Sequence, residues 1–191
     1  NWATGVTVTV TAVDNDIIDG TPRTCTVQSA APTTSDDPNF ADLTISPVTV
    51  TVNDDDVAAI IVEPTNLTVF EPDSTATFTV RLASRPTAIV SVPLSLDPAA
   101  NVCGVATGTV DIAPDQWQTG VDVSIWAVDD LVSGNRTCTV LTGDPSSADA
   151  LYNALNAGDV DDVTVQVIDD ETPQVIVLPT AITAPEGDEQ A

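Results

Sequence analysis

QWQTGVDVSIWAVDD, residues 116–130, decides how this chain is organised, because the chain opens on a near copy of it. Residues 1–15 read NWATGVTVTVTAVDN, so that Trp2 corresponds to Trp117 at a separation of 115 residues. The same separation places residues 48–55 on residues 163–170 and Glu71 on Glu186. Matches in three separate places at one separation indicate an internal repeat, which bears on the architecture before any other feature does.

Apolar and polar residues alternate along most of the chain, a pattern typical of strands with one buried face. Pro93 lies on the outer face of one such strand, which favours an edge strand or a bulge there. Val, Ile and Thr are abundant, no convincing helix is predicted, and short alternating strands separated by turns favour an immunoglobulin-like two-sheet sandwich. The alternation predicts strands over 5–13, 23–28, 48–52, 60–63, 67–70, 75–82, 88–96, 107–112, 121–128, 135–141 and 163–168.

The repeat divides the chain into three parts. We predict that 1–56 is the C-terminal part of one sandwich module, 57–171 a complete module of about seven strands, and 172–191 the first strand of a following module. Residues 1–56 lack the other strands of their module, which would leave an apolar face and bare strand edges uncovered. We expect the cover to come from neighbouring modules of the same chain or from another copy by strand donation.

The charge of the chain restricts its partners. It has 29 acidic residues against four basic ones, a net charge of −25, and no histidine. Nucleic acid and anionic membranes attract basic surfaces, so neither is an expected partner. No apolar run approaches the roughly 20 residues of a membrane span, so direct membrane insertion is not expected either. A Ser-His catalytic set and a lysine Schiff base are excluded for this sequence, and we predict that it is not an enzyme.

Four parts of the sequence together resemble the Calx-β-type module: Glu71, the strand TATFTVRL at 75–82, the segment 121–130 and the closing segment 163–171. The resemblance is strongest to tandem modules of very large bacterial surface and secreted proteins. It implies an extracellular all-β sandwich with calcium bound at one end. The calcium ligands that it implies are Glu71, Asp97, Asp129, Asp130, Asp169 and Asp170, with Glu171 as a further candidate.

Acidic residues gathered at one end of a sandwich favour a cation on physical grounds as well. Two carboxylates about 4 Å apart repel by about 4 kcal/mol at an effective dielectric constant of about 20, so they must bind a cation, take up protons or turn into water. Calcium accepts several oxygen ligands in flexible geometry, and the sequence offers no Cys/His set for zinc. The alternative is that these acids are solvated turn residues, where Asp is common.

The repeat also bears on the three cysteines. Cys25 and Cys138 occupy equivalent positions in two copies of the sequence RTCTV, residues 23–27 and 136–140, and the equivalent of Cys103 would lie before residue 1. We predict a Cys103–Cys138 disulfide, which stabilises by about 4 kcal/mol on the chain-entropy estimate. Such a bond indicates an oxidising compartment, extracellular or at the cell surface. The alternative is three buried free thiols.

Trp126 is the remaining residue that the fold alone does not explain. Its repeat equivalent is Thr11, so a sandwich of this kind does not require Trp there. The alternation places Trp126 on the outer face, where packing against a neighbouring side chain or loop is the favoured interpretation. The alternative is an anchor in an interface between subunits, where Trp is enriched.

The sequence therefore predicts a structural repeat segment of an extracellular or cell-surface fibre or adhesin stalk, rigidified by calcium and a disulfide and assembling end to end or by strand donation. Modules follow one another without a linker, because the acidic run at 54–56 continues directly into the strand at 60–63. The alternative is an adhesive or calcium-regulated ligand-binding module, in which one surface recognises a ligand.

Overall fold

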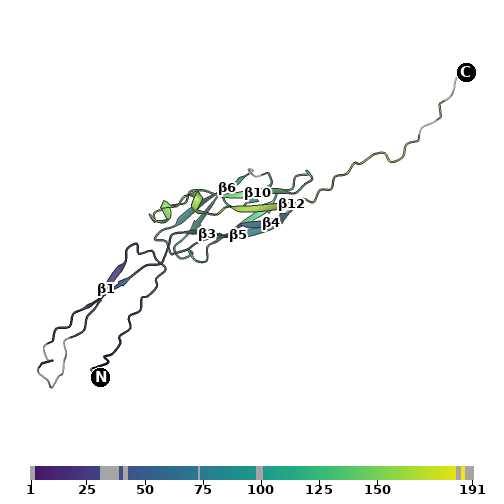
Figure 1. Cartoon of the computed structure of the whole chain (residues 1–191). Helices are drawn as coiled ribbons and strands as arrows, with labels where there is room; N and C mark the ends of the chain where they lie inside the picture. The colour runs from purple at the N-terminus through teal and green to yellow at the C-terminus, as the bar shows by residue number, and fades with distance from the viewer. Residues whose placement is uncertain are drawn as a thin grey trace.

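The computed structural model describes residues 3–30, 39–40, 43–72, 74–97, 101–183 and 186–187. A two-layer β-sandwich occupies the middle of the molecule, a two-stranded hairpin lies at one end, and the C-terminal segment extends from the other (Figure 1). Two short 3-10 turns, η1 (Tyr152–Ala154) and η2 (Ala157–Asp159), interrupt the strands. The described part of the chain contains no helix long and apolar enough to cross a membrane.

The smaller sheet of the sandwich has four strands in the order β3-β5-β9-β7, all antiparallel. Its strands are β3 (Ile60–Glu63), β5 (Thr75–Leu82), β9 (Val121–Ala127) and β7 (Cys103–Val105). Alternate side chains point into the core, so that Phe78, Val80 and Ile125 are fully buried.

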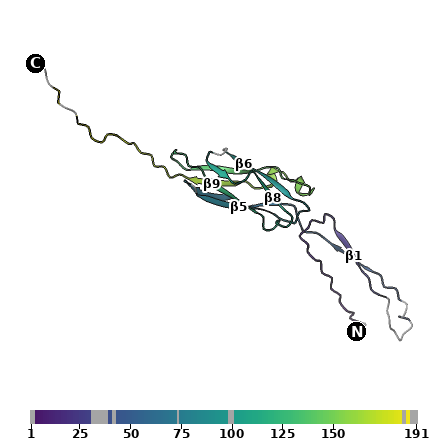
Figure 2. The same ribbon diagram turned by 180° about the vertical axis from the view of Figure 1, so that it is seen from behind.

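The larger sheet has the order β11-β6-β10-β12-β4, with β8 also paired to β6. β4 runs parallel to β12, and the other neighbours are antiparallel. β6 and β8 belong to this sheet, and β5 and β9 belong to the smaller one; all four are labelled in Figure 2. The strands are β4 (Asn66–Phe70), β6 (Val90–Asp97), β8 (Thr109–Ile112), β10 (Arg136–Thr142), β11 (Ser146–Ser147) and β12 (Val163–Ile168).

A disulfide joins Cys103 on β7 to Cys138 on β10, and thereby ties the two sheets together. This is the pair that the repeat predicts. Cys25 is exposed and not disulfide-bonded. A disulfide in a domain of this kind indicates an oxidising compartment outside the cytoplasm.

The strands predicted within 60–168 are confirmed to within a few residues at their ends, and the structure adds the short strands β7 and β11. Of the two alternatives predicted at Pro93, the edge strand is wrong, because β6 has neighbours on both sides. Pro93 lies opposite Thr109 of β8, between Leu94, which pairs with β10, and Ser91, which pairs with β11. On the side of β6 that faces β10 and β11, Pro93 falls between the residues that pair with each of these two strands. Its missing N–H therefore interrupts neither the β10 ladder nor the β11 ladder.

The hairpin at the other end consists of β1 (Arg23–Val27) and β2 (Val48–Val52), and its register repeats that of β10 and β12. Cys25 lies opposite Val50, and Cys138 lies opposite Val165. The burial differs, however: Val165 is 0% exposed, whereas Val50 is only half-buried. The same strand pair therefore forms in both places, and the hairpin lacks the cover that the sandwich has.

The strand predicted over 5–13 is wrong. These residues, all of which the structure describes, are assigned to no strand, although they alternate as regularly as their repeat equivalent β9. β9 is held between β5 and β7, and the described residues before β1 include no counterpart of either. Val6 and Val8 are accordingly 90% and 76% exposed. An alternating pattern specifies which face to bury, but a strand also needs neighbours for its backbone groups.

Candidate metal centre

The direction of β4 and β12 brings acidic residues together at one pole of the sandwich. The two strands are parallel, so their C-terminal ends lie at the same end of the sheet. Glu71 follows β4 directly, and its N–H donates to the carbonyl of Ile168, the last residue of β12, at 2.9 Å. The chain then continues from β12 through Asp169, Asp170 and Glu171. The loop after β9, which contains Asp129, reaches the same pole.

Four carboxylates meet at this pole and form what we call the acidic cluster. One carboxylate oxygen from each residue lies within 4.8 Å of those of the other three. Glu71 is buried at 7% exposure, Glu171 is half-buried, and the two aspartates are exposed. The cluster is therefore closed on the Glu71 side and open to solvent on the aspartate side. Its members are Glu71, Asp129, Asp170 and Glu171.

Oxygen atoms without a partner show that the cluster is incomplete by itself. Among the described residues, Oε2 of Glu71 and Oε2 of Glu171 are buried without a hydrogen-bond partner, and so is Oδ1 of the adjacent Asp169. Buried carboxylate oxygens need a hydrogen-bond donor or a cation to offset the loss of hydration. A donor set made only of carboxylates suits a hard cation such as calcium and does not suit zinc, which prefers nitrogen and sulfur.

The raised pKa values of two members of the cluster also indicate carboxylates that lack a counter-charge. Burial first, and then the charges of Asp130, Asp169 and Asp129, raise the pKa of Glu71 above its ordinary value. The pKa of Glu171 is raised to about 7, first because its protonated carboxyl can donate a hydrogen bond to Asp169, and then by burial and the neighbouring carboxylates. The site therefore resists full ionisation at neutral pH in the absence of a bound cation.

Two of the predicted ligands, Asp130 and Asp169, are not among the four clustered acids, and their hydrogen bonds hold the adjoining loop. Oδ1 of Asp130 accepts from the Val132 N–H at 2.8 Å, and its Oδ2 forms an ion pair with Arg136. Oδ2 of Asp169 accepts from the Gly134 N–H at 2.8 Å. That bond is the first reason why the pKa of Asp169 is held below its ordinary value.

Asp97 was predicted as a ligand and lies outside the acidic cluster, whereas Arg136 was not predicted and lies beside it. Asp97 is exposed at the end of β6, where it lies opposite Thr139, and is not one of the four clustered acids. Arg136 was not predicted as a site residue, yet it neutralises Asp130 and lowers the pKa of Glu71 in part. The signal was present in the composition, because the chain has only four basic residues.

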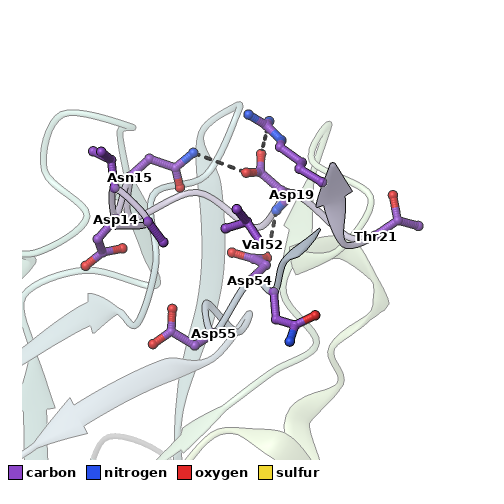
Figure 3. Close-up of a pocket in the computed structure, with 11 residues that line it drawn as sticks. Asp14, Asn15, Asp19, Thr21, Val52, Asp54 and Asp55 are labelled. Atoms are coloured by element: carbon purple, nitrogen blue, oxygen red, sulfur yellow. Dashed lines mark hydrogen bonds and ion pairs between the residues drawn. The ribbon is translucent and has the colours of Figure 1, made fainter. Parts of the chain in front are cut away.

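A second group of acids lies at the base of the hairpin, around a surface pocket (Figure 3). The separation of 115 residues makes Asp14, Asp55 and Asp56 the equivalents of Asp129, Asp170 and Glu171. The loop bond is repeated as well, since the Asp19 N–H donates to Oδ2 of Asp54 at 2.8 Å. Residues labelled at the pocket in Figure 3 are Asp14, Asn15, Asp19, Thr21, Val52, Asp54 and Asp55.

Asp56 has the same unsatisfied character as Glu171. Its Oδ2 is buried without a hydrogen-bond partner among the described residues. Burial, followed by the charges of Asp54 and Asp14, raises the pKa of Asp56. Residues 1–56 therefore contain equivalents of three of the four members of the acidic cluster, and the equivalent of Glu71 would lie before residue 1.

Trp126 lies on the outer face of β9, as the alternation predicts, and is 36% exposed. Its indole ring occupies the space above Gly104, the residue opposite it on β7. The favoured interpretation, packing within the module, therefore has a specific contact. A role as an interface anchor stays a prediction.

No protein-family model matches the chain, and no curated protein matches its sequence. Solved structures show similarity of fold. The Apo-form Calx CBD1 domain is 19% identical over 61% of this chain and 100% of that chain, with a TM-score of 0.44. CBD12 from CALX1.2 is 19% identical over 59% of this chain and 44% of that chain, with a TM-score of 0.42. WR4, a C. elegans MSP family member, is 10% identical over 59% of this chain and 98% of that chain, at 0.39.

Proposed function

We propose that this chain is a structural segment of an extracellular or cell-surface fibre, built from repeated β-sandwich modules that calcium stiffens at their ends. The acidic cluster is the observation that carries the proposal. Glu71 and Asp129 belong to the body of the sandwich, whereas Asp170 and Glu171 begin the segment that leaves it. A cation bound by all four ties the exit segment to the module. Without a cation, the same carboxylates repel each other and loosen that connection.

The repeated local structure supports a tandem arrangement. The β1–β2 and β10–β12 pairs share one register, and the loops at 15–19 and 130–134 share their hydrogen bonds. Asp16 and Leu131, 115 residues apart, both adopt a positive φ, of 56° and 62°. Non-glycine residues rarely do so, and the match therefore supports two copies of one module design.

A junction without a linker supports stiffness between the hairpin and the sandwich. The acidic run ends at Asp56, and the carbonyl of Val57 already accepts from Ser84 Oγ of the sandwich at 2.9 Å. Across the same junction, the Arg85 N–H donates to the Asp16 carbonyl at 2.7 Å. We propose no catalytic role, because the acidic cluster contains carboxylates alone and no nucleophile and base set.

Calcium titration of the Glu71→Gln variant tests the proposal. The wild-type chain is expected to bind calcium, and Glu71→Gln is expected to bind it at least about tenfold more weakly, because one of four ligands loses its charge. Isothermal titration calorimetry measures the affinity. Thermal unfolding checks the fold: in chelator the variant should be as stable as the wild type or more so, since it carries less repulsion.

Asp97→Asn is the matched control, because it removes the same kind of charge from an acid outside the cluster. Its calcium affinity should equal that of the wild type. A wild-type chain that binds no calcium, or an equal loss of affinity in both variants, contradicts the proposal.

A further inference from the structure

The C-terminal segment is apolar, extended and exposed. Ile176, Leu178 and Ile182 are 70%, 78% and 82% exposed, and residues 172–183, all described, belong to no strand. By the separation of 115 residues, this segment is equivalent to β3 and β4 of the sandwich. Ile182 corresponds to Leu67, and Thr183 corresponds to Thr68. The segment therefore has the sequence of a strand but pairs with no strand among the described residues.

β2 has the free edge that such a strand needs. In the sandwich, β12 pairs with β10 on one side and, in parallel, with β4 on the other. Its equivalent β2 pairs with β1 and, in the described part of the chain, with no second strand. An edge of this kind presents unpaired N–H and C=O groups to any strand of matching pattern.

We propose that the C-terminal segment of one copy adds to the free edge of β2 in a second copy, parallel to it and in the register of β4 on β12. Leu67 lies opposite Val165 and Thr68 opposite Gln166. The equivalent register places Ile182 opposite Val50 and Thr183 opposite Thr51. The hairpin and the C-terminal segment lie at opposite ends of the sandwich (Figure 1). Copies joined in this way therefore form an open head-to-tail chain.

Glu186 adds a cation-binding carboxylate to this contact. This part of the proposal rests on the proposed function. Glu186 is the repeat equivalent of Glu71, a position that has no counterpart within residues 1–56. In the joined copies, Glu186 completes a four-carboxylate cation site with Asp14, Asp55 and Asp56 of the second copy. Without a divalent cation, like charges oppose the contact, so association is expected to be stronger in calcium than in chelator.

Cysteine trapping tests the register. One preparation carries Thr51→Cys and another Thr183→Cys, both with Cys25→Ser, and the two are mixed in calcium under mild oxidation. These positions are direct partners in the proposed register, so a mixed disulfide is expected. Thr49→Cys mixed with Thr183→Cys is the control, because it is displaced by two residues on the same face. We expect at least tenfold less mixed disulfide from the control, and equal yields overturn the proposal.

Sedimentation velocity tests the donor segment. Ile182→Asp is expected to weaken self-association at least tenfold, since it places a charge opposite Val50. Val177→Asp is the matched control: Val177 is 69% exposed in the same segment, but its equivalent Val62 pairs with β5, which has no counterpart among the described residues before β3. It should associate like the wild type. Equal effects of the two variants, or a wild-type chain that stays monomeric in calcium, overturn the proposal.

Failure of this inference can be separated from failure of the proposed function. Calcium affinity at the acidic cluster is measured in the Ile182→Asp chain, which is expected to be monomeric. Calcium binding there with no selective cross-link overturns the strand addition alone. A selective cross-link in a chain that binds no calcium overturns the proposed function and the role of Glu186, while the strand addition stands.

Discussion

At the scale of single residues, Gly104 is required by its neighbour rather than by its backbone angle. A Cβ at this position would lie 2.2 Å from Cε2 of Trp126. We expect Gly104→Ala to lower the free energy of unfolding by about 1–3 kcal/mol, the usual cost of overpacking. In a Trp126→Ala background the same change should cost much less. Urea unfolding of the four proteins in a double-mutant cycle measures this coupling, and additive losses would contradict the contact.

Asp149 provides a pH-dependent contribution to stability. Burial alone raises the pKa of Asp149, but hydrogen bonds from the N–H and hydroxyl of Thr87, at 2.8 and 2.9 Å, and from the Leu151 N–H outweigh it and hold the pKa below its ordinary value. A lowered folded-state pKa means that the contribution is complete above the unfolded-state pKa and is lost as pH falls through the folded-state pKa.

Asp149→Asn is accordingly expected to cost about 1–3 kcal/mol at pH 7, with a smaller cost at pH 3 and below. Urea unfolding at the two pH values measures the difference. Asp97→Asn, a change at an exposed acid, should leave stability unchanged at pH 7. A cost for Asp149→Asn that does not vary with pH would show that the residue acts through packing alone.

At the scale of elements, the disulfide between β7 and β10 closes a sequence separation of 35 residues. Replacing Cys103 and Cys138 with serine is expected to lower the free energy of unfolding by about 4 kcal/mol, chiefly through the greater freedom of the unfolded chain. Chemical unfolding of the double variant measures this loss. Cys25→Ser removes a thiol that makes no disulfide and should leave the stability unchanged.

The strands also show how far a pattern reaches. Period-two alternation predicted β5 and β9 correctly. Both strands have a buried face and a paired neighbour on each side. The same pattern failed over 5–13, because the described residues provide no neighbouring strand there. β7 and β11 were not predicted because three and two residues are too short for alternation to be recognised. Their existence depends on β9 and β6, to which they pair.

At the scale of the whole molecule, the proposed cation fixes the angle between a module and the segment that leaves it. Small-angle X-ray scattering in calcium is expected to show a stiffer, more uniform molecule than in chelator, because the exit segment is tied at Asp170 and Glu171. Glu71→Gln should reduce this response, whereas Asp97→Asn should retain it. Identical scattering of the wild type with and without calcium would remove calcium as the stiffening agent.

Four of the seven acids that the sequence implied as ligands meet in the acidic cluster, and three do not. The parallel alignment of β4 with β12 explains the first group, since it places Glu71 beside the residues that follow Ile168. Asp130 pairs with Arg136, and Asp169 accepts from the Gly134 N–H; no spacing rule places either group near these acids.

The sequence by itself determined the repeat, the strand pattern and the cysteine pair, because these follow from local periodicity and from comparing the chain with itself. Only the tertiary structure decided which stretches become strands and which carboxylates share a site. The physical reason is that backbone hydrogen bonds and charge repulsion both depend on neighbours distant in sequence. Residues 5–13 alternate as a strand does, but the described residues place no strand beside them. Asp97 has a carboxylate, but it is not one of the four clustered acids.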